Sequence, residues 1–119
     1  MSRRTERVND LLREQLSELI QREVKDPRVT QRLVSITEVQ VSPDLRHATV
    51  YVSHLGDAGE REEVLRGLGA AAHFLHAELM HRLKMRNVPE LLFRFDPSIE
   101  RGARLASLIS DVAEHDHGG

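Results

Sequence analysis

The spacing of apolar residues changes along this chain, and that change is the strongest constraint on its fold. In residues 4–24 the apolar side chains recur at the three- and four-residue spacing of an amphipathic helix. From residue 33 to residue 55 they alternate with polar side chains, as in half-buried strands. A helical spacing returns after residue 60, and a short alternating run follows at 91–95. A single chain that switches between these spacings predicts an α+β domain.

Two strands are expected to form a hairpin. The first, residues 33–41, alternates with a phase slip of one residue, which predicts a β-bulge near Thr37 or Glu38. The segment Ser-Pro-Asp-Leu at 42–45 is typical of a short turn, and alternation resumes over 47–55.

The helices have recognisable start and stop signals. Asp26-Pro27 ends the first helix, because the residue before proline is pushed out of the helical region. Asp57, with Glu60 three residues later, resembles an N-cap with its reciprocal acid. The small residues from Gly67 to His73 then predict a break between two helices, the second running from Phe74 to Arg86.

A third strand and a last helix complete the expected order. Residues 91–95 form the strand, and Asp96-Pro97 is a plausible cap and first-turn pair for the helix. The apolar stripe of this helix consists of Leu105, Leu108, Ile109 and Val112. We therefore expect helix, strand, strand, helix, helix, strand and helix, with a three-stranded sheet and the helices packed on one face.

Length and composition favour one soluble domain. A chain of 119 residues is long enough for a modest core, so we expect a domain at 1–112 and a disordered polar tail at 113–119. The absence of cysteine excludes disulfides, thiolate metal sites and cysteine nucleophiles. No apolar run approaches the roughly 20 residues of a membrane span, and no apolar signal segment opens the chain, so we expect a cytoplasmic protein without membrane contact.

Catalytic and metal-binding patterns are weak. His73 and His76 can share a helical face, but His81 lies about 500° of helix rotation beyond His76 and points elsewhere. There is no His-Glu-x-x-His motif, no Gly-x-Ser-x-Gly motif and no glycine-rich phosphate loop. We expect no catalytic residue, no metal and no cofactor, and a histidine-based metal hydrolase is the least favoured alternative.

Clusters of cations are the more informative polar feature, because the formal net charge of −2 conceals them. The candidate phosphate contacts are Arg3, Arg4, Arg7, Lys25, Arg28, Arg82, Lys84 and Arg86. The arginines at the start of the first helix oppose the helix dipole, unless Glu6 and Asp10 neutralise them. The clusters form one basic patch only if the fold brings them together. We expect them to bind phosphates rather than to read bases.

The expected order of elements resembles the bacterial, type II form of the KH RNA-binding fold. Specific sequence segments give a closer resemblance, to the ribosome-binding factor A family. This resemblance extends from about Arg4 to Asp111. The segments are IQREVKDPRV at 20–29, VQVSPDLRHATVYVS at 39–53, RLKMRNVPELLFRFDPSIERG at 82–102 and the Arg-Val-Asn-Asp-Leu-Leu start. Lys-Asp-Pro-Arg at 25–28 and Val-Pro-Glu-Leu at 88–91 are specific when found together.

The resemblance implies a function. A family member binds the immature small (30S) ribosomal subunit and its 16S rRNA and supports late maturation and rRNA processing without catalysis, particularly in the cold. Release by a GTPase is associated with the family, and we expect a monomer. The alternative is a protein–protein adaptor that uses an edge of the sheet and makes no contact with RNA.

One departure from the family stands at the expected helix kink. Alignment on Phe74 places the family's Ala-x-Gly pattern at Ala71, Ala72 and His73, so histidine replaces glycine. A side chain there disfavours the backbone freedom and close approach that glycine permits. His76 also stands where relatives tend to have arginine.

Overall fold

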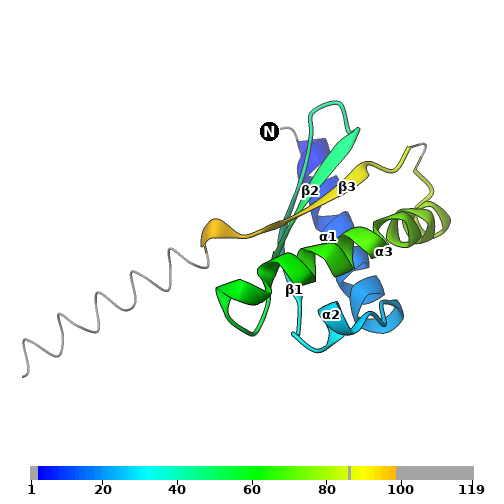
Figure 1. Cartoon of the computed structure of the whole chain (residues 1–119). Helices are drawn as coiled ribbons and strands as arrows, with labels where there is room; N and C mark the ends of the chain where they lie inside the picture. Colours follow the sequence, from blue (N-terminus) through cyan, green and yellow to red (C-terminus); the bar gives the residue numbers. More distant parts are fainter. Residues whose placement is uncertain (1–2, 86, 99–119) are drawn as a thin grey trace, which may run out of the picture.

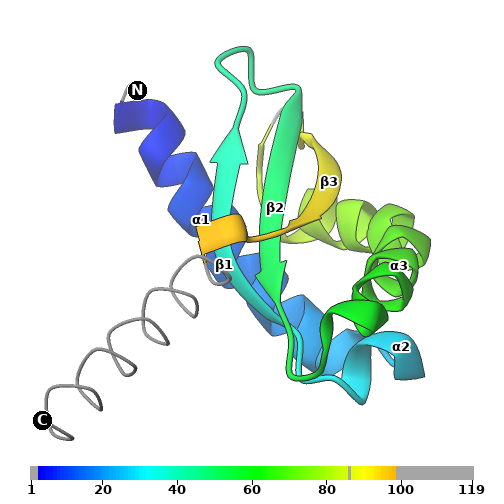
Figure 2. The same cartoon turned by 60° about the vertical axis from the view of Figure 1, so that its left-hand side comes forward.

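A three-stranded sheet covered by helices forms the body of the molecule. The computed structural model describes residues 3–85 and 87–98. Its elements are α1 (Arg3–Glu23), α2 (Pro27–Thr30), β1 (Ser35–Val41), β2 (His47–Ser53), the 3₁₀ turn η1 (Ala58–Glu60), α3 (Arg61–Arg82) and β3 (Glu90–Phe95). Figure 1 shows their arrangement, and in Figure 2 the sheet stands in front with α1 and α3 behind it. The predicted α+β architecture, with helices on one face of the sheet, is confirmed.

The sheet has the order β1-β2-β3. β1 and β2 form the predicted antiparallel hairpin, and the register shifts between Ile36 and Glu38, which confirms the predicted bulge. β3 pairs with β2 in the parallel direction, from His47 opposite Glu90 to Val52 opposite Phe95. Because parallel neighbours need a crossover, α3 must carry the chain back along the length of the sheet.

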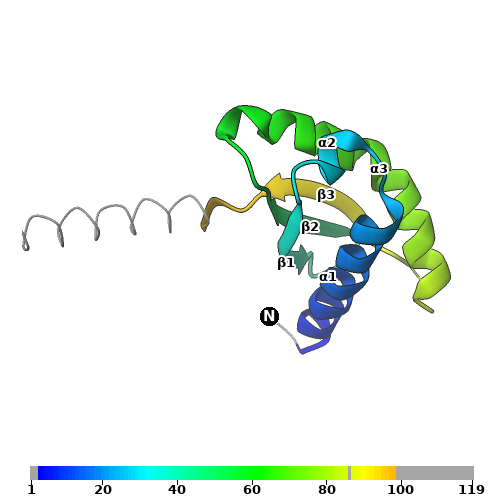
Figure 3. The same cartoon turned by 90° about the horizontal axis from the view of Figure 1, so that it is seen from below.

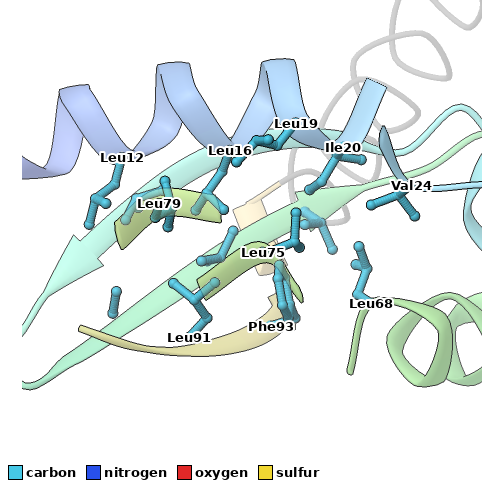
Figure 4. Close-up of a cluster of buried hydrophobic side chains, with 14 of the residues drawn as sticks. Leu12, Leu16, Leu19, Ile20, Val24, Leu68, Leu75, Leu79, Leu91 and Phe93 are labelled. Atoms are coloured by element: carbon cyan, nitrogen blue, oxygen red, sulfur yellow. The ribbon is translucent and has the colours of Figure 1, made fainter. Parts of the chain in front are cut away.

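The core lies between the sheet and the two long helices (Figure 4). Leu12, Leu16 and Leu19 project from α1 and are fully buried. Leu68, Leu75 and Leu79 are their fully buried counterparts on α3, and Leu91 and Phe93 are 9% exposed on β3. The helical and alternating spacings therefore identify most of the core, although Leu11 and Phe74 are 38% and 41% exposed despite lying in the predicted stripes.

The predicted break in the second helical region is not present. α3 is a continuous helix of 22 residues, and Ala71, Ala72 and His73 lie inside it. Figure 3 shows that α3 nevertheless changes direction along its length, so a bend replaces the break. Leu68 and Leu75 stay buried on either side of the replaced pattern, as expected for a helix that curves around its core. Since alanine and histidine accept helical angles, nothing at 71–73 forces the helix to end.

The glycines of α3 have different surroundings. A Cβ atom built on Gly67 would lie 2.8 Å from Val29 Cγ2 and 3.1 Å from Arg28 Cβ, whereas a Cβ on Gly69 would meet nothing within 4 Å. Gly67 is therefore required for the close approach of α2 to α3, and Gly69 is not. The short helix α2 itself is not foreseen from the sequence, because Asp26-Pro27 ends one helix and also caps another.

We predict opposite effects from the same substitution at these two glycines. Gly67→Ala should lower the free energy of unfolding by about 1 to 3 kcal/mol, because its methyl group overpacks the contact with Val29. Gly69→Ala should raise it by about 0.5 to 1 kcal/mol, because alanine is the better residue in an exposed helix interior. Urea denaturation measures both. Equal stability of the Gly67→Ala variant and the parent protein would show that α2 is not packed as described.

Two further predictions concern the ends of elements. The predicted cap by Asp57 is wrong: its side chain makes no capping hydrogen bond, and a 3₁₀ turn leads into α3 instead. The Glu60 carboxylate instead accepts a hydrogen bond from Arg32 Nε at 3.1 Å. Asp96 does accept a hydrogen bond from the Ser98 N–H at 2.8 Å, as expected for a cap. Most of the predicted last helix, and the whole predicted tail, lie outside the described residues.

Candidate nucleic-acid interface

The candidate cations fall at two separate ends of α1. Arg3, Arg4 and Arg7 occupy its first two turns, whereas Lys25 and Arg28 follow its last residue, Glu23. A helix of 21 residues is about 30 Å long, so these groups do not form one patch. Each end must therefore be assessed by its own charges.

At the Lys25 end, Arg28 is already paired. Its Nη2 lies 2.7 Å from Asp26 Oδ2, and its Nε lies 3.0 Å from Asp26 Oδ1. The same Oδ1 accepts the Arg28 backbone N–H at 2.9 Å. Hydrogen bonds from the Arg28 side chain hold the pKa of the Asp26 carboxyl below its ordinary value, and this pairing raises the pKa of Arg28. Much of the charge of Arg28 is thus used within the protein.

Arg32 is also committed to internal contacts. Its Nε lies 3.1 Å from Glu60 Oε2 and its Nη2 lies 2.6 Å from Glu63 Oε2. This side chain is only 18% exposed and ties the corner after α2 to the start of α3. In the described part of this corner Lys25 is left as an exposed cation without an ion pair.

The Asp26–Arg28 pair predicts a pH dependence of stability. A carboxyl with a lowered pKa in the folded state stabilises the protein above its ordinary pKa of about 3.9, and that stabilisation is lost as the pH falls through the folded-state value. Asp26→Asn keeps a side-chain oxygen that can cap α2 but removes the charge, so it should lower stability at neutral pH and cost progressively less below about pH 4.

Urea midpoints at neutral and acidic pH, for the parent and the Asp26→Asn variant, measure this difference. In an Arg28→Gln background the effect of Asp26→Asn should lose most of its pH dependence. A difference between parent and Asp26→Asn that stays constant across the pH range would contradict the assigned pair.

The opposite end of the molecule gathers cations from several segments. β3 begins beside the start of β2, with His47 opposite Glu90, and the Glu90 N–H donates to the Arg46 carbonyl at 2.8 Å. The segment that leaves α3 therefore lies beside the hairpin turn. Figures 1 and 2 show that the first turns of α1 are at the same end of the sheet.

These segments surround an open depression of about 720 Å³. It is lined by Arg4, Asp44, Leu45, Arg46, Met85, Asn87 and Val88. Arg4 and Arg46 are exposed, as is Lys84, the residue before Met85. We call the set Arg3, Arg4, Arg7, Arg46 and Lys84 the basic end.

The cations of the basic end form no ion pairs within the described residues, although Arg46 is close enough to Asp44 to help lower the pKa of that carboxyl, after the hydrogen bonds from Ser42 and from the Arg46 N–H. None of the five forms an ion pair there, and Glu6 and Asp10 do not pair with the neighbouring arginines. Arg82 is different, because its Nη1 lies 3.4 Å from Glu18 and 3.3 Å from Gln15 on α1. Arg86 lies outside the described residues.

His76 has a structural contact rather than a place in the basic end. Its Nε2 lies 2.9 Å from the carbonyl oxygen of Val88. Because a carbonyl only accepts, this nitrogen carries the hydrogen and donates it. His76 thereby holds the segment before β3 against α3.

Arg46 is the residue that reasoning from sequence misses. It follows the Ser-Pro-Asp-Leu turn and stands apart in sequence from every other cation cluster. The parallel pairing of β3 with β2 brings it beside the exit of α3, and the packing of α1 on β1, where the Val41 N–H donates to Asn9 Oδ1 at 2.8 Å, brings Arg4 to the same depression.

Metal-binding clusters and membrane-spanning helices are both absent from the described residues. No group of three or more histidine, aspartate or glutamate side chains there could hold a metal ion. Within the same part of the chain, no helix is both long and apolar enough to cross a membrane.

Comparison with known proteins identifies the family. The family model described as ribosome-binding factor A matches residues 4–109. This chain belongs to the ribosome-binding factor A family. It is 47% identical to the ribosome-binding factor A of Dehalococcoides mccartyi strain 195 over 115 residues, which cover 97% of both chains. It is 48% identical to that of Synechococcus sp. strain CC9605 over 112 residues, which cover 94% of this chain and 80% of the relative.

Solved structures agree with the family fold. The crystal structure of ribosome-binding factor A from Thermus thermophilus matches with a TM-score of 0.68 and 32% identity, covering 76% of this chain and 93% of that one. A Thermus thermophilus ribosome-binding factor A homology model, fitted into the cryo-EM map of a 30S–RbfA complex, matches with a TM-score of 0.58 and 34% identity. That match covers 71% of this chain and 87% of the other.

Proposed function

We propose that this protein binds the immature small ribosomal subunit through its 16S rRNA and supports late maturation and processing of that RNA. The observation that carries the proposal is the basic end, where exposed arginines and a lysine from α1, the hairpin and the α3 exit converge and form no ion pairs with the rest of the described chain. The family and the 30S complex of a Thermus relative support the choice of partner. Phosphate oxygens are the natural ligands of such a surface, and arginine can bind them through paired N–H groups.

The protein acts by binding and not by catalysis. A protein that binds one arrangement of RNA better than another shifts the population toward it. Such an effect is most useful in the cold, when alternative RNA pairings persist. The protein acts in the cytoplasm as a monomer, and departure from the finished subunit requires a further event, for which a GTPase is the candidate that the family resemblance supplies.

The two ends of the molecule make unequal contributions in this proposal. Lys25 is exposed, but Arg28 is paired with Asp26, so the corner after α1 presents less free charge than the basic end. Arg82 likewise shares its charge with Glu18. The principal phosphate contacts are therefore the cations of the basic end, Arg3, Arg4, Arg7, Arg46 and Lys84, and Lys25 is a peripheral one.

Charge reversal at the basic end tests the proposal. The double variant Arg4→Glu/Lys84→Glu should lose most of its affinity for immature small subunits in cosedimentation. Binding of the parent should weaken with salt, with a log-log slope of roughly −0.7 to −0.9 per phosphate neutralised, and the variant should have a shallower slope.

The matched control is Arg22→Glu/Arg66→Glu. These side chains are 72% and 67% exposed, lie away from the basic end, and give the same change in net charge. This control should bind nearly as well as the parent, and circular dichroism verifies that both variants fold. Equal loss in both double variants would indicate that only net charge matters, and parent binding that is unaffected by salt would refute the proposed RNA contact.

An adaptor without RNA contact is the second candidate. β1 and β3 are the edges of the sheet in the described residues, and an edge strand can pair with a partner strand. A gel-shift with 16S rRNA fragments separates the two functions. Absence of any shift, together with a stable complex with a ribosomal protein, would favour the adaptor.

A further inference from the structure

The hairpin turn holds a leucine in an unfavourable backbone conformation. Leu45 has φ of 62°, in the left-handed region that glycine and asparagine occupy more readily. Leu33 is the other non-glycine residue with positive φ in the described chain, at 47°. Backbone strain of this kind occurs often at functional sites. The presence of leucine, rather than glycine or asparagine, at each of these two positions therefore calls for a structural or functional explanation.

The turn around Leu45 is fixed by its own hydrogen bonds. The Leu45 N–H donates to the Ser42 carbonyl at 2.8 Å, and the Ser42 N–H donates to the His47 carbonyl at 2.8 Å. Asp44 Oδ1 accepts from Ser42 Oγ at 2.6 Å and from the Arg46 N–H at 3.1 Å. These contacts use backbone groups and the side chains of Ser42 and Asp44 and do not involve the Leu45 side chain, so glycine, which readily adopts this conformation, would fit there without strain.

The leucine side chain at position 45 has a place in the depression at the basic end. It is half-buried, because one side of it packs against the hydrophobic core, and it lines the depression together with Met85, which also packs against the core, and the buried Val88. Arg4 and Arg46 line the same space. Leu33, in contrast, is 66% exposed and lies beside Ile20 and Val29, near the end of α1 opposite the basic end.

This combination of surfaces matches one unpaired nucleotide. Apolar side chains offer contact to the face of a base, and guanidinium groups offer hydrogen bonds to the phosphate. Asp44 and Asn87 also line the depression. The carboxylate would repel a phosphate placed directly on it but can accept hydrogen bonds from the edge of a base, and the Asn87 amide can donate or accept. A base in a duplex is stacked between its neighbours and cannot present its face.

We propose that the depression receives a single unpaired nucleotide of RNA, with its base against Leu45 and Met85 and its phosphate between Arg4 and Arg46. This inference rests on the proposed function and adds to it that the contacted RNA is single-stranded at this point. Leu45 then has two contacts in the turn, one with the hydrophobic core and one, through its outer side, with the base.

Substitutions at the two left-handed leucines test the proposal. Leu45→Gly removes the apolar side chain and also relieves the backbone, and Leu45→Asn replaces it with a polar side chain that tolerates the same conformation. Leu33→Gly is the matched control, since it makes the same change at the other left-handed leucine. The probe is a fluorescent oligouridine of about ten nucleotides, compared with an RNA duplex of the same length, in anisotropy titrations at low salt.

The parent protein should bind the oligouridine more tightly than the duplex. Both Leu45 variants should lose roughly tenfold in affinity for the single strand, because the contact with the base buries apolar surface of the leucine, and little for the duplex, while Leu33→Gly binds like the parent. Thermal unfolding identifies a Leu45 variant that fails to fold, in which case the other variant decides. An equal affinity of the parent for both RNAs, no binding of oligouridine by the parent, or unchanged binding by folded Leu45 variants would overturn the inference.

A failure of the nucleotide site can be distinguished from a failure of the proposed function. If the Leu45 variants and the parent bind the oligouridine equally, but the parent still binds immature subunits in a salt-dependent manner, only the nucleotide site is refuted. If the parent does not bind immature subunits, the proposed function itself fails.

Discussion

The parallel pairing of β3 with β2 determines where the charges of this protein gather. An antiparallel third strand could follow β2 through a short turn, but a parallel one requires the chain to return along the sheet first. α3 makes that return and delivers the segment before Glu90 to the side of Arg46, where the Glu90 N–H donates to the Arg46 carbonyl at 2.8 Å. Because the hairpin reaches the same end, three separate parts of the sequence meet there.

Internal ion pairs then decide which cations remain available. The corner after α1 is rich in arginine, but Arg28 binds Asp26 and Arg32 binds Glu60 and Glu63. These contacts hold α2, η1 and α3 together and reduce the charge offered to a partner. At the basic end the described cations have no such partners, so a chain with a formal net charge of −2 can still present a surface suited to RNA.

Local sequence patterns predict most of the elements, but not how they meet. The alternation that slips near Thr37 is enough to place the bulge, because one extra residue reverses the face of every following side chain. The helical stripe likewise identifies Leu12, Leu16 and Leu19. The meeting of Arg46 with Arg4 and with the α3 exit depends on two long-range contacts, the packing of α1 on β1 and the pairing of β3 with β2, and no local pattern encodes them.

The glycines of α3 show a second limit of local reasoning. A run of small residues with glycines suggests a break, yet Gly67 serves the close approach of α2, and α3 continues through Ala71, Ala72 and His73. The need for a small residue is set by Val29, on another element. α3 is therefore bent but uninterrupted, and the proposed RNA contacts lie at its exit and not at the bend.

Ultraviolet crosslinking of the protein to immature small subunits, with the linked peptides identified by mass spectrometry, tests the central claim most directly. We expect crosslinked peptides from the first turns of α1, from the hairpin turn that contains Leu45 and Arg46, and from the segment around Lys84. Crosslinks confined to the corner at Lys25 and Arg28, or to the open face of the sheet, would contradict the assignment of the basic end as the RNA contact.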